Sequence, residues 1–299
     1  MHLLLTCLLL LPAAVLAAGP RAVVFQTDFS LKDGAVAAMK GVALGVSPRL
    51  ALHDLTHEIP PYSIWDAACR LKQTVAYWPA GTVFVSVVDP GVGTDRRSVV
   101  ARTRAGHYVV TPDNGTLTFL AASPGLAEVR VIDAERQRLP GSAESYTFHG
   151  RDVFAYVAAR LAAGNLRSRE VGPLAPGDVI RLPHEAAALG ADGVLRGTLT
   201  VSDPNYGNLW SNIPKDLLLR AGLRLGDTVG VRVLHDGRER YAGRLPYVAT
   251  FGEVPVGAPL LYLNSLLEAA LALNQGSFAA EFAAGAGPGW TLELARLPP

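Results

Sequence analysis

Cysteine, charge and basic clusters are all scarce in this sequence. Its 299 residues include only two cysteines, Cys7 and Cys69, and 18% charged residues. If the N-terminal segment is cleaved, Cys69 is the only thiol left, which excludes an intramolecular disulfide. The 27 basic and 26 acidic residues give a net charge of +1, and no basic run stands out. The chain therefore lacks the electrostatic footprint of a nucleic-acid-binding protein, and a small-molecule ligand is favoured.

The N-terminus is the one strongly apolar segment. Residues 3–11 form an apolar run, and small residues follow up to Ala18. This pattern, with an A-x-A-like site ending at Ala17, predicts a signal peptide over residues 1–17 and an exported protein, periplasmic or secreted, that is free of the membrane after cleavage. The run is too short to span a bilayer comfortably. The residues before the apolar run include no Lys or Arg, so a wrongly assigned start or a short anchor is the alternative. Without a signal peptide the protein would be cytoplasmic.

Strand-like and helix-like segments alternate in the first part of the chain, which is typical of an α/β fold. We expect strands at 21–25, 50–55, 82–88, 99–102 and 107–111, and helices at 35–44, 64–77, 117–122 and 152–163. After a Pro- and Gly-containing stretch at 172–183, short β-type runs dominate, at 195–201, 228–234 and 239–248, with one helix expected at 266–273. The sequence thus predicts an N-terminal α/β domain over 20–180, with a central, mostly parallel sheet, and a smaller, mainly β domain over 190–299.

The loop after the strand at 82–88 is the most informative polar segment. It reads Asp89-Pro90-Gly91-Val92-Gly93-Thr94-Asp95-Arg96. Proline and two glycines make a tight turn whose backbone can approach a ligand. A carboxylate and a guanidinium folded across that turn can pair with each other or with one bound water. A purely structural, salt-bridged turn is the alternative.

Three other polar segments each allow a functional and a structural interpretation. His149 precedes a helix and is either a catalytic residue or a satisfied capping or core histidine, and Asp152 is expected to cap that helix. His53 and His57 are four residues apart, but the segment reads as a strand followed by two prolines, so their imidazoles should not converge on a metal. The segment from Asp203 to Trp210 suits stacking on a planar base, or aromatic side chains that pack in a turn.

Together these segments resemble the S-adenosylmethionine hydroxide adenosyltransferases, relatives of the fluorinating and chlorinating enzymes. The matching segments occur in the family's order over about residues 21–280. They are residues 26–33 (QTDFSLKD), 39–42 (MKGV), 54–61 (DLTHEIPP), 87–94 (VVDPGVGT), 112–115 (PDNG), 148–152 (FHGRD), 203–210 (DPNYGNLW), 212–214 (NIP) and 264–265 (NS).

The resemblance implies an α/β domain followed by a barrel-like β domain, and a homotrimer that binds substrate between subunits. It implies that Asp28 holds the ribose hydroxyls and Asp203 the methionine amino group. It places Tyr206, Asn208, Trp210 and Phe251 around adenine. It also assigns substrate contacts to Asp33, Tyr62, Asn114 and Ser265. Asp89, Arg96 and His149 match the trio that activates water. No metal or cofactor is implied, since S-adenosylmethionine is the substrate.

The implied reaction is attack of water on ribose C5′, which yields adenosine and methionine. A base must take a proton from the water, and either Asp89 or His149 can do so. The halogenases of the family carry an uncharged residue where this chain has Asp89, and a carboxylate would repel a halide. An exported adenosyl-binding protein without turnover is the alternative function. Two departures from the family pattern, Ser30 and Pro204-Asn205-Tyr206, concern the substrate contacts.

Overall fold

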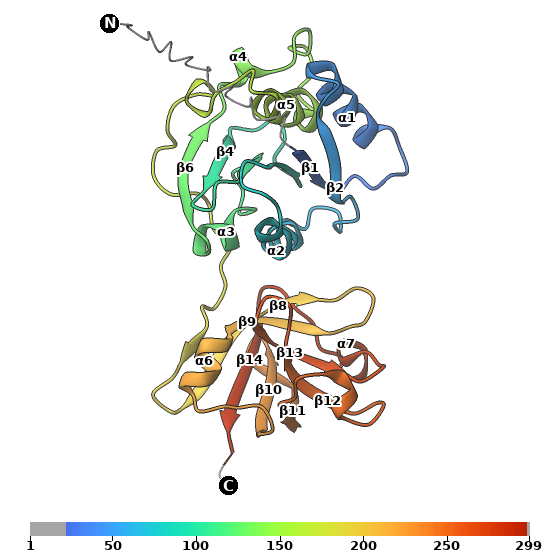
Figure 1. The fold of residues 1–299 in the computed structure, drawn as a ribbon, viewed down its shortest axis with the longest axis vertical. Helices are drawn as coiled ribbons and strands as arrows, with labels where there is room; N and C mark the ends of the chain where they lie inside the picture. The colour runs from blue at the N-terminus through green and yellow to red at the C-terminus, as the bar shows by residue number, and fades with distance from the viewer. Residues whose placement is uncertain (1–21, 298–299) are drawn as a thin grey trace, which may run out of the picture.

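The computed structural model describes residues 22–297, which form two sheets joined by one linker (Figure 1). The signal peptide predicted over residues 1–17 lies outside the described residues. Within residues 22–297, the structure contains no helix with the length and apolar character needed to cross a membrane.

The first sheet has six strands in the order β2-β1-β3-β5-β4-β6. Strands β1, β2, β3 and β5 pair in parallel, whereas β4 runs antiparallel to both β5 and β6. All five residues of β3 are buried, as expected of a strand covered on both faces. The strands are β1 (Ala22–Thr27), β2 (Ala51–Thr56), β3 (Val83–Val87), β4 (Ser98–Thr103), β5 (Tyr108–Pro112) and β6 (Leu126–Val131). The predicted α/β class with a mostly parallel sheet is confirmed.

Helices cover both faces of this sheet. Successive side chains of a strand point to opposite faces, and both faces of the central strands carry apolar side chains that the helices bury. Phe25 and Val85 pack with α1 (Ala35–Val46) and α5 (Tyr156–Ala163), and Figure 1 shows these two helices on one side of the sheet. Phe84 packs instead toward α2 (Ile64–Thr74) and α3 (Thr118–Ala122) on the opposite side. Short helical segments complete this part of the chain: η1 (Val75–Tyr77), α4 (Ala134–Gln137), η2 (Gly150–Ala155) and η3 (Ser168–Glu170).

The second sheet curls into a nearly closed, antiparallel barrel in the order β11-β10-β14-β8-β9-β13-β12. The two ends of this path meet where Val248 N donates a 3.0 Å hydrogen bond to Leu261 O, beside a parallel bridge between Tyr247 and Leu261. The barrel-like architecture implied by the family resemblance is thus confirmed. Its strands are β7 (Ala188–Leu189), β8 (Val194–Ser202), β9 (Leu209–Pro214), β10 (Thr228–His235), β11 (Arg238–Pro246), β12 (Pro259–Leu263), β13 (Glu268–Leu273) and β14 (Trp290–Arg296), with α6 (Lys215–Arg220), η4 (Phe251–Glu253) and α7 (Phe278–Glu281) between them.

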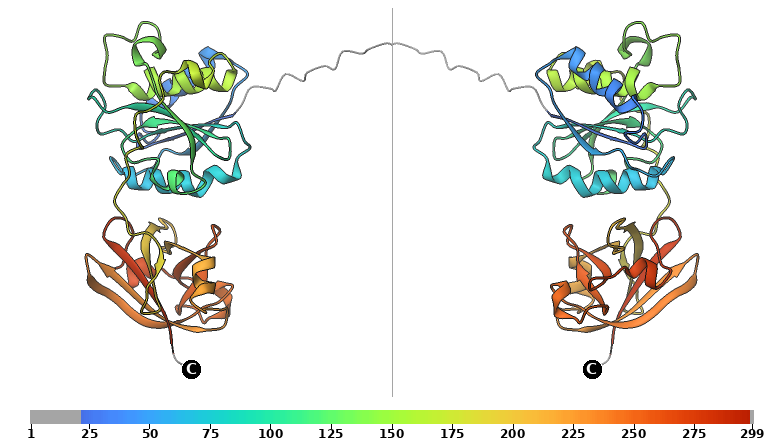
Figure 2. Two further views of the ribbon diagram at one scale, coloured as in Figure 1. Left: turned by 90° about the vertical axis from the view of Figure 1, so that its left-hand side faces the viewer. Right: turned by 90° about the vertical axis from the view of Figure 1, so that its right-hand side faces the viewer.

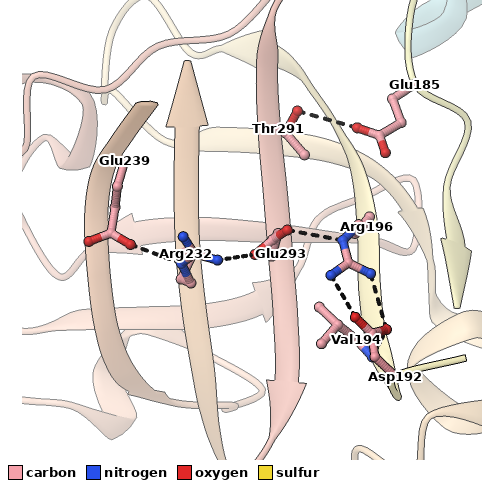
Figure 3. Close-up of polar contacts among 8 residues, drawn as sticks. All are labelled: Glu185, Asp192, Val194, Arg196, Arg232, Glu239, Thr291 and Glu293. Atoms are coloured by element: carbon pink, nitrogen blue, oxygen red, sulfur yellow. Dashed lines mark hydrogen bonds and ion pairs between the residues drawn. The ribbon is translucent and has the colours of Figure 1, made fainter. Parts of the chain in front are cut away.

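A ladder of charges crosses the outer face of four barrel strands (Figure 3). Glu293 of β14 lies between Arg196 of β8 and Arg232 of β10, at 3.0 and 2.8 Å. Asp192 and Glu239 pair with the outer sides of the same two arginines. Opposite charges on neighbouring strands stabilise the sheet, and a slip by one residue would separate them. The ladder is therefore consistent with the register of β14 between its neighbours, in which Glu293 lies opposite both arginines.

Helix α2 joins the sheet to the barrel. Both views in Figure 2 show it lying on the side of the sheet that faces the barrel. Trp65 Nε1 donates a 2.8 Å hydrogen bond to Thr200 O of β8, and Lys72 Nζ lies 2.5 Å from Glu268 Oε1 of β13. Tyr77, just beyond α2, donates from its hydroxyl to Ser265 O at 3.1 Å. These contacts fix the orientation of the barrel relative to the sheet.

The start of the linker, residues 171–175, runs along the outer edge of β6. Asp133 N and Val131 N donate to Val171 O and Pro173 O at 3.1 and 2.9 Å, and Ala175 N donates to a carbonyl of β6 at 2.9 Å. The linker therefore extends the hydrogen bonding of the sheet for a few residues before it turns toward the barrel.

Two sequence-based expectations for local structure are wrong. Residues 266–273 were expected to form a helix, but Glu268–Leu273 is strand β13, paired with β9 and β12 and buried throughout. Its alanines and leucines suit a helix, and the tertiary pairing overrides that preference. Asp152 does not cap a helix: it is fully buried within the π-helical turn η2 and accepts a 2.7 Å hydrogen bond from Arg151 Nε.

Candidate active site

The carboxyl ends of the central strands meet at one edge of the first sheet, which is where open α/β sheets bind ligands. Asp28 follows β1, Asp89 lies just after β3 and Asn114 just after β5. Strand β4 runs in the opposite direction, so Arg96, two residues before its first residue, lies at the same edge. The topology alone therefore brings acidic, amide and guanidinium groups together.

Asp89, Arg96 and His149 form one connected group. Arg96 Nε donates a 2.8 Å hydrogen bond to Asp89 Oδ1, and Arg96 Nη2 donates to Asp89 Oδ2. The same Nη2 lies 3.1 Å from His149 Nδ1, and Nη1 donates to Ser98 Oγ at 2.6 Å. The Asp89 and Arg96 side chains are only 5% and 10% exposed. The three residues that the sequence singles out are thus in contact.

Two successive turns fold Arg96 back over Asp89. Val92 N donates to Asp89 O at 3.2 Å, and Thr94 N to Gly91 O at 3.1 Å. Gly93 adopts φ +79°, and a Cβ there would lie 3.3 Å from the Tyr146 carbonyl oxygen. Glycine is favoured at this position because its backbone is left-handed and closely packed.

His149 stands immediately before the π-helical turn η2, which continues into α5. A π-helical turn is rare and frequently marks a functional site. Its first residue, Gly150, is packed tightly: a Cβ there would lie 3.3 Å from the rings of both Phe148 and Phe29. The turn and this packing together aim the imidazole at Arg96.

The contact with Arg96 defines the protonation state of His149. A guanidinium has no acceptor atom, so His149 Nδ1 must accept the hydrogen bond and Nε2 carries the proton. Burial, and then the positive charge of Arg96, lower the pKa of His149 below its usual value of 6.5. His149 is therefore a neutral imidazole at neutral pH, and its Nε2–H donates to no other group within residues 22–297.

Asp28 and Tyr62 lie together beside this group. Tyr62 N donates a 2.9 Å hydrogen bond to Asp28 Oδ2, and the Tyr62 side chain is 73% exposed. Asn114 Nδ2 donates to Val88 O at 2.9 Å, which ties the end of β5 to the residue before Asp89. Asp33, in contrast, accepts a 2.9 Å hydrogen bond from the backbone of Ala35, the first residue of α1.

The predicted adenine-binding residues gather in the barrel. A cavity of about 800 Å³ is lined by Tyr206, Asn208, Trp210, Phe251 and Ser265, together with other residues between 205 and 277. Asp203 lies next to it and accepts hydrogen bonds from the backbone of Asn205 and Tyr206 at 2.9 and 3.1 Å. Aromatic walls with a few polar groups suit a planar, polar ligand.

The two groups of predicted site residues lie apart in one chain. The barrel cavity is lined by residues between 205 and 277, whereas the Asp89, Arg96 and His149 group lies on the first sheet. The cavity lining includes no residue of that group. Among the described residues of one chain, the predicted site residues thus form two separate groups, which are called half-sites below.

His53 and His57 do not face a common point. The His53 ring packs against Trp78 at 5.1 Å between centroids. His57 uses both ring nitrogens in hydrogen bonds, to Thr27 Oγ1 at 2.8 Å and to Asp54 Oδ1 at 2.9 Å. Among residues 22–297, no group of three or more His, Cys, Asp and Glu side chains is placed to hold a metal ion.

Three residues that contribute to these half-sites were not identified from the sequence. Ser98 holds Arg96, and its position two residues further along an extended segment was the available signal. Asn264 lines the barrel cavity, and its buried amide nitrogen has no hydrogen-bond partner among the described residues. Arg138 adds positive charge that lowers the pKa of His149, after burial and Arg96. Nothing in the sequence pointed to Arg138.

Comparison with known families assigns the chain. Residues 23–172 match the model of the SAM hydroxide adenosyltransferase N-terminal domain, and residues 197–291 match that of the C-terminal domain. The chain therefore belongs to the SAM hydroxide adenosyltransferase family, a family of enzymes.

Individual relatives cover most of the chain. A protein of Thermus thermophilus named (R)-S-adenosyl-L-methionine hydrolase is 40% identical over 86% of this chain and 93% of its own length. A fluorinase of an Actinoplanes species is 30% identical over 86% of this chain and 92% of its own. The crystal structure of an uncharacterized conserved protein from Thermotoga maritima superimposes with a TM-score of 0.82 at 33% identity, covering 92% of this chain and all of that one.

Proposed function

We propose that this protein hydrolyses S-adenosylmethionine to adenosine and L-methionine by in-line attack of water on ribose C5′. The observation that carries the proposal is the connected group of Asp89, Arg96 and His149 at the carboxyl edge of the sheet. The relatives named as hydrolases support it. A protein that only binds an adenosyl ligand has no need of such a group.

The substrate needs help with the nucleophile rather than with the leaving group. The sulfonium leaves as a neutral thioether, so no acid is required at sulfur. A guanidinium about 4 Å from a water is worth roughly 4 kcal/mol at an effective dielectric of about 20, which lowers the pKa of the water by about three. Because free water has a pKa of about 15.7, Arg96 alone leaves it protonated at neutral pH. A base must remove the proton during attack.

Asp89 is the base in this proposal. His149 Nδ1 is occupied by Arg96 and Nε2 already carries a proton, so His149 can donate to the water but not accept from it. Each carboxylate oxygen of Asp89 accepts from Arg96 and keeps a second lone pair. The water oxygen bonds to C5′, the C5′–S electron pair moves to sulfur, and the released proton goes to Asp89.

The charge of Asp89 also selects water over halide. A halide would have to sit beside a carboxylate that is almost fully buried, where repulsion between like charges is poorly screened. A neutral water suffers no such repulsion and can donate to the carboxylate. In this proposal the charge at position 89 favours the activity in the name of the Thermus thermophilus relative over that in the name of the Actinoplanes relative.

The direct test is incubation of the purified protein with S-adenosylmethionine, followed by chromatography. We expect adenosine and methionine in equal amounts and, in high chloride, no 5′-chloro-5′-deoxyadenosine. Intact ligand after incubation, with saturable binding by calorimetry, would instead identify a binding protein. Accumulation of the chlorinated nucleoside would identify a halogenase.

We further propose that the two half-sites combine between subunits of a homotrimer. Tyr62 beside Asp28 is 73% exposed and Tyr206 at the barrel cavity is 67% exposed, although both are placed to contact substrate. Large apolar side chains exposed at a polar site are typical of surfaces that another chain covers. One subunit would supply the Asp89 group and its neighbour the barrel cavity.

Mixed trimers test this arrangement. Asp89→Asn and Asn208→Ala each disable a different half-site, so each variant alone is expected to be inactive. If subunits exchange at random, about a quarter of the sites in an equal mixture combine two intact halves, and about a quarter of wild-type activity returns. A mixture no more active than its separate components would show that each site is built within one chain.

We also propose, on the evidence of residues 1–17 alone, that the protein is exported. The intact mass of the protein recovered from its source would then lack these residues; a full-length mass would contradict export by cleavage.

A further inference from the structure

A hydrogen-bond network of four polar side chains begins at Thr27, the residue before Asp28. Thr27 Oγ1 lies 2.8 Å from His57 Nδ1, and His57 Nε2 lies 2.9 Å from Asp54 Oδ1. Lys40 of α1 donates to the other Asp54 oxygen at 2.6 Å. Thr27 is fully buried and His57 is 4% exposed, whereas the Asp54 side chain is 39% exposed. The network thus connects the protein surface to the residue before Asp28.

The direction of each hydrogen bond in this network follows from the groups that can only donate. Phe29 N donates to Thr27 Oγ1 at 3.1 Å, so the Thr27 hydroxyl can give its own hydrogen to His57 Nδ1. His57 Nε2 then carries the ring proton and donates to Asp54. The hydrogen bonds from Lys40 and His57 lower the pKa of the Asp54 carboxyl despite the opposing effect of its partial burial. Each contact of the network therefore has a donor and an acceptor when His57 accepts at Nδ1 and donates at Nε2.

The order Thr27, His57, Asp54 resembles the arrangement of a hydroxyl nucleophile with its base and orienting acid. A nucleophile, however, must reach a substrate. Thr27 has no exposed surface, and its hydroxyl already accepts from Phe29 N and faces His57. The network is thus not a second catalytic centre. Its role is to hold the backbone of the loops after β1 and β2 in place.

Two further contacts join the same segments around Asp28. Ser30 N donates a 2.8 Å hydrogen bond to His57 O, and Tyr62 N donates to Asp28 Oδ2 at 2.9 Å. Ser30 and Tyr62 both have left-handed backbones, with φ of 55° and 66°. Such conformations are costly for residues other than glycine and persist only where surrounding contacts enforce them. The loops after β1 and β2 are thus held against each other on either side of the Asp28 carboxylate.

We propose that His57 is a positioning residue: through the Thr27 side chain and the Ser30 backbone, it holds the Asp28 carboxylate in the orientation that accepts two vicinal hydroxyls of a ribose. The inference rests on the proposed function, in which Asp28 binds the ribose. It assigns to His57 a role in recognising the sugar and no contact with substrate.

Two variants test the inference, with a matched control. Thr27→Val removes the hydroxyl at nearly constant volume, and His57→Gln removes the Nδ1 acceptor. In both we expect KM for S-adenosylmethionine to rise about tenfold or more, as for a lost hydrogen bond to a charged group, with a smaller change in kcat. His53→Gln, four residues earlier within β2 but packed on Trp78, should leave KM unchanged.

The decisive measurement is discrimination between S-adenosylmethionine and its 2′-deoxyribose analogue. The wild type should prefer the ribose compound, because Asp28 accepts from both hydroxyls, and Thr27→Val and His57→Gln should lose most of that preference. A general loss of packing would weaken both ligands equally and leave the ratio unchanged. An unchanged ratio in both variants overturns the inference.

Nuclear magnetic resonance of the wild type checks the geometry without turnover. Nitrogen-15 shifts of the His57 ring should report a hydrogen on Nε2 and an accepting Nδ1, and Thr27→Val should perturb the Nδ1 signal. Protonation at Nδ1 instead would overturn the assignment. If the wild type neither binds nor cleaves S-adenosylmethionine, the proposed function fails, and this result is distinct from an active wild type whose variants keep their discrimination.

Discussion

Asp89→Asn is expected to lower kcat by about 10²–10⁴-fold, the usual contribution of a positioned general base. Asparagine keeps the shape of the side chain but cannot take a proton from water. Its amide NH₂ would also face the donors of Arg96, which now approach both carboxylate oxygens. KM should change far less than kcat, because the barrel cavity and Asp28 are untouched. Single-turnover release of adenosine measures the chemical step directly.

Asp95→Asn is the matched control for this variant. Asp95 lies in the same loop, one residue before Arg96, but is exposed, so its neutralisation should leave kcat within about twofold of the wild type, as for most exposed substitutions. If Asp89→Asn hydrolyses S-adenosylmethionine at the wild-type rate, another group removes the proton and the proposed role of Asp89 is wrong.

The acid side of the pH profile is expected to report His149. Below its pKa, His149 would carry a proton on Nδ1 that points at the Arg96 guanidinium, so two donors would face each other and the group would separate. Activity should therefore be lost as pH falls. Because burial and Arg96 lower the pKa of His149, the midpoint of this loss should lie below 6.5. The rate kcat/KM measured from pH 4.5 to 8 gives that midpoint.

His149→Gln should remove this midpoint and lower kcat by about 10- to 100-fold, since one oriented donor to the water is lost. His235→Gln, on the far barrel strand β10 and stacked on Trp290, should keep the wild-type profile. A midpoint above 6.5, or one that survives unchanged in His149→Gln, would show that His149 is not the group that titrates.

The fold was largely predictable because its strands are short apolar runs bounded by turns. Residues 82–88 and 107–111 needed no tertiary information, since apolar and β-branched residues dominate both runs. Strand β13 was missed because its alanines and leucines fit a helix equally well, and only pairing with β9 and β12 decides between the two. Strand β6 alternates apolar and charged residues in a partly exposed segment, and its edge position cannot be derived from its own residues.

The candidate site was predictable as a set of motifs but not as a geometry. Asp89 and Arg96 share a loop, so their pairing across the turn could be proposed from the sequence. His149 lies 53 residues beyond Arg96, and only the π-helical turn after it explains its direction. The separation of the barrel cavity from the Asp89 group likewise depends on how α2 docks against β8 and β13, which no single segment encodes.

The path of the linker along β6 has a consequence for the behaviour of this protein at high concentration. An unpaired outer strand offers its backbone donors and acceptors to any other chain, and edge-to-edge association of this kind begins many aggregates. By hydrogen bonding to residues 129–133, the linker occupies those groups. The segment that connects the two folded halves thus also shields one flank of the sheet from unwanted self-association.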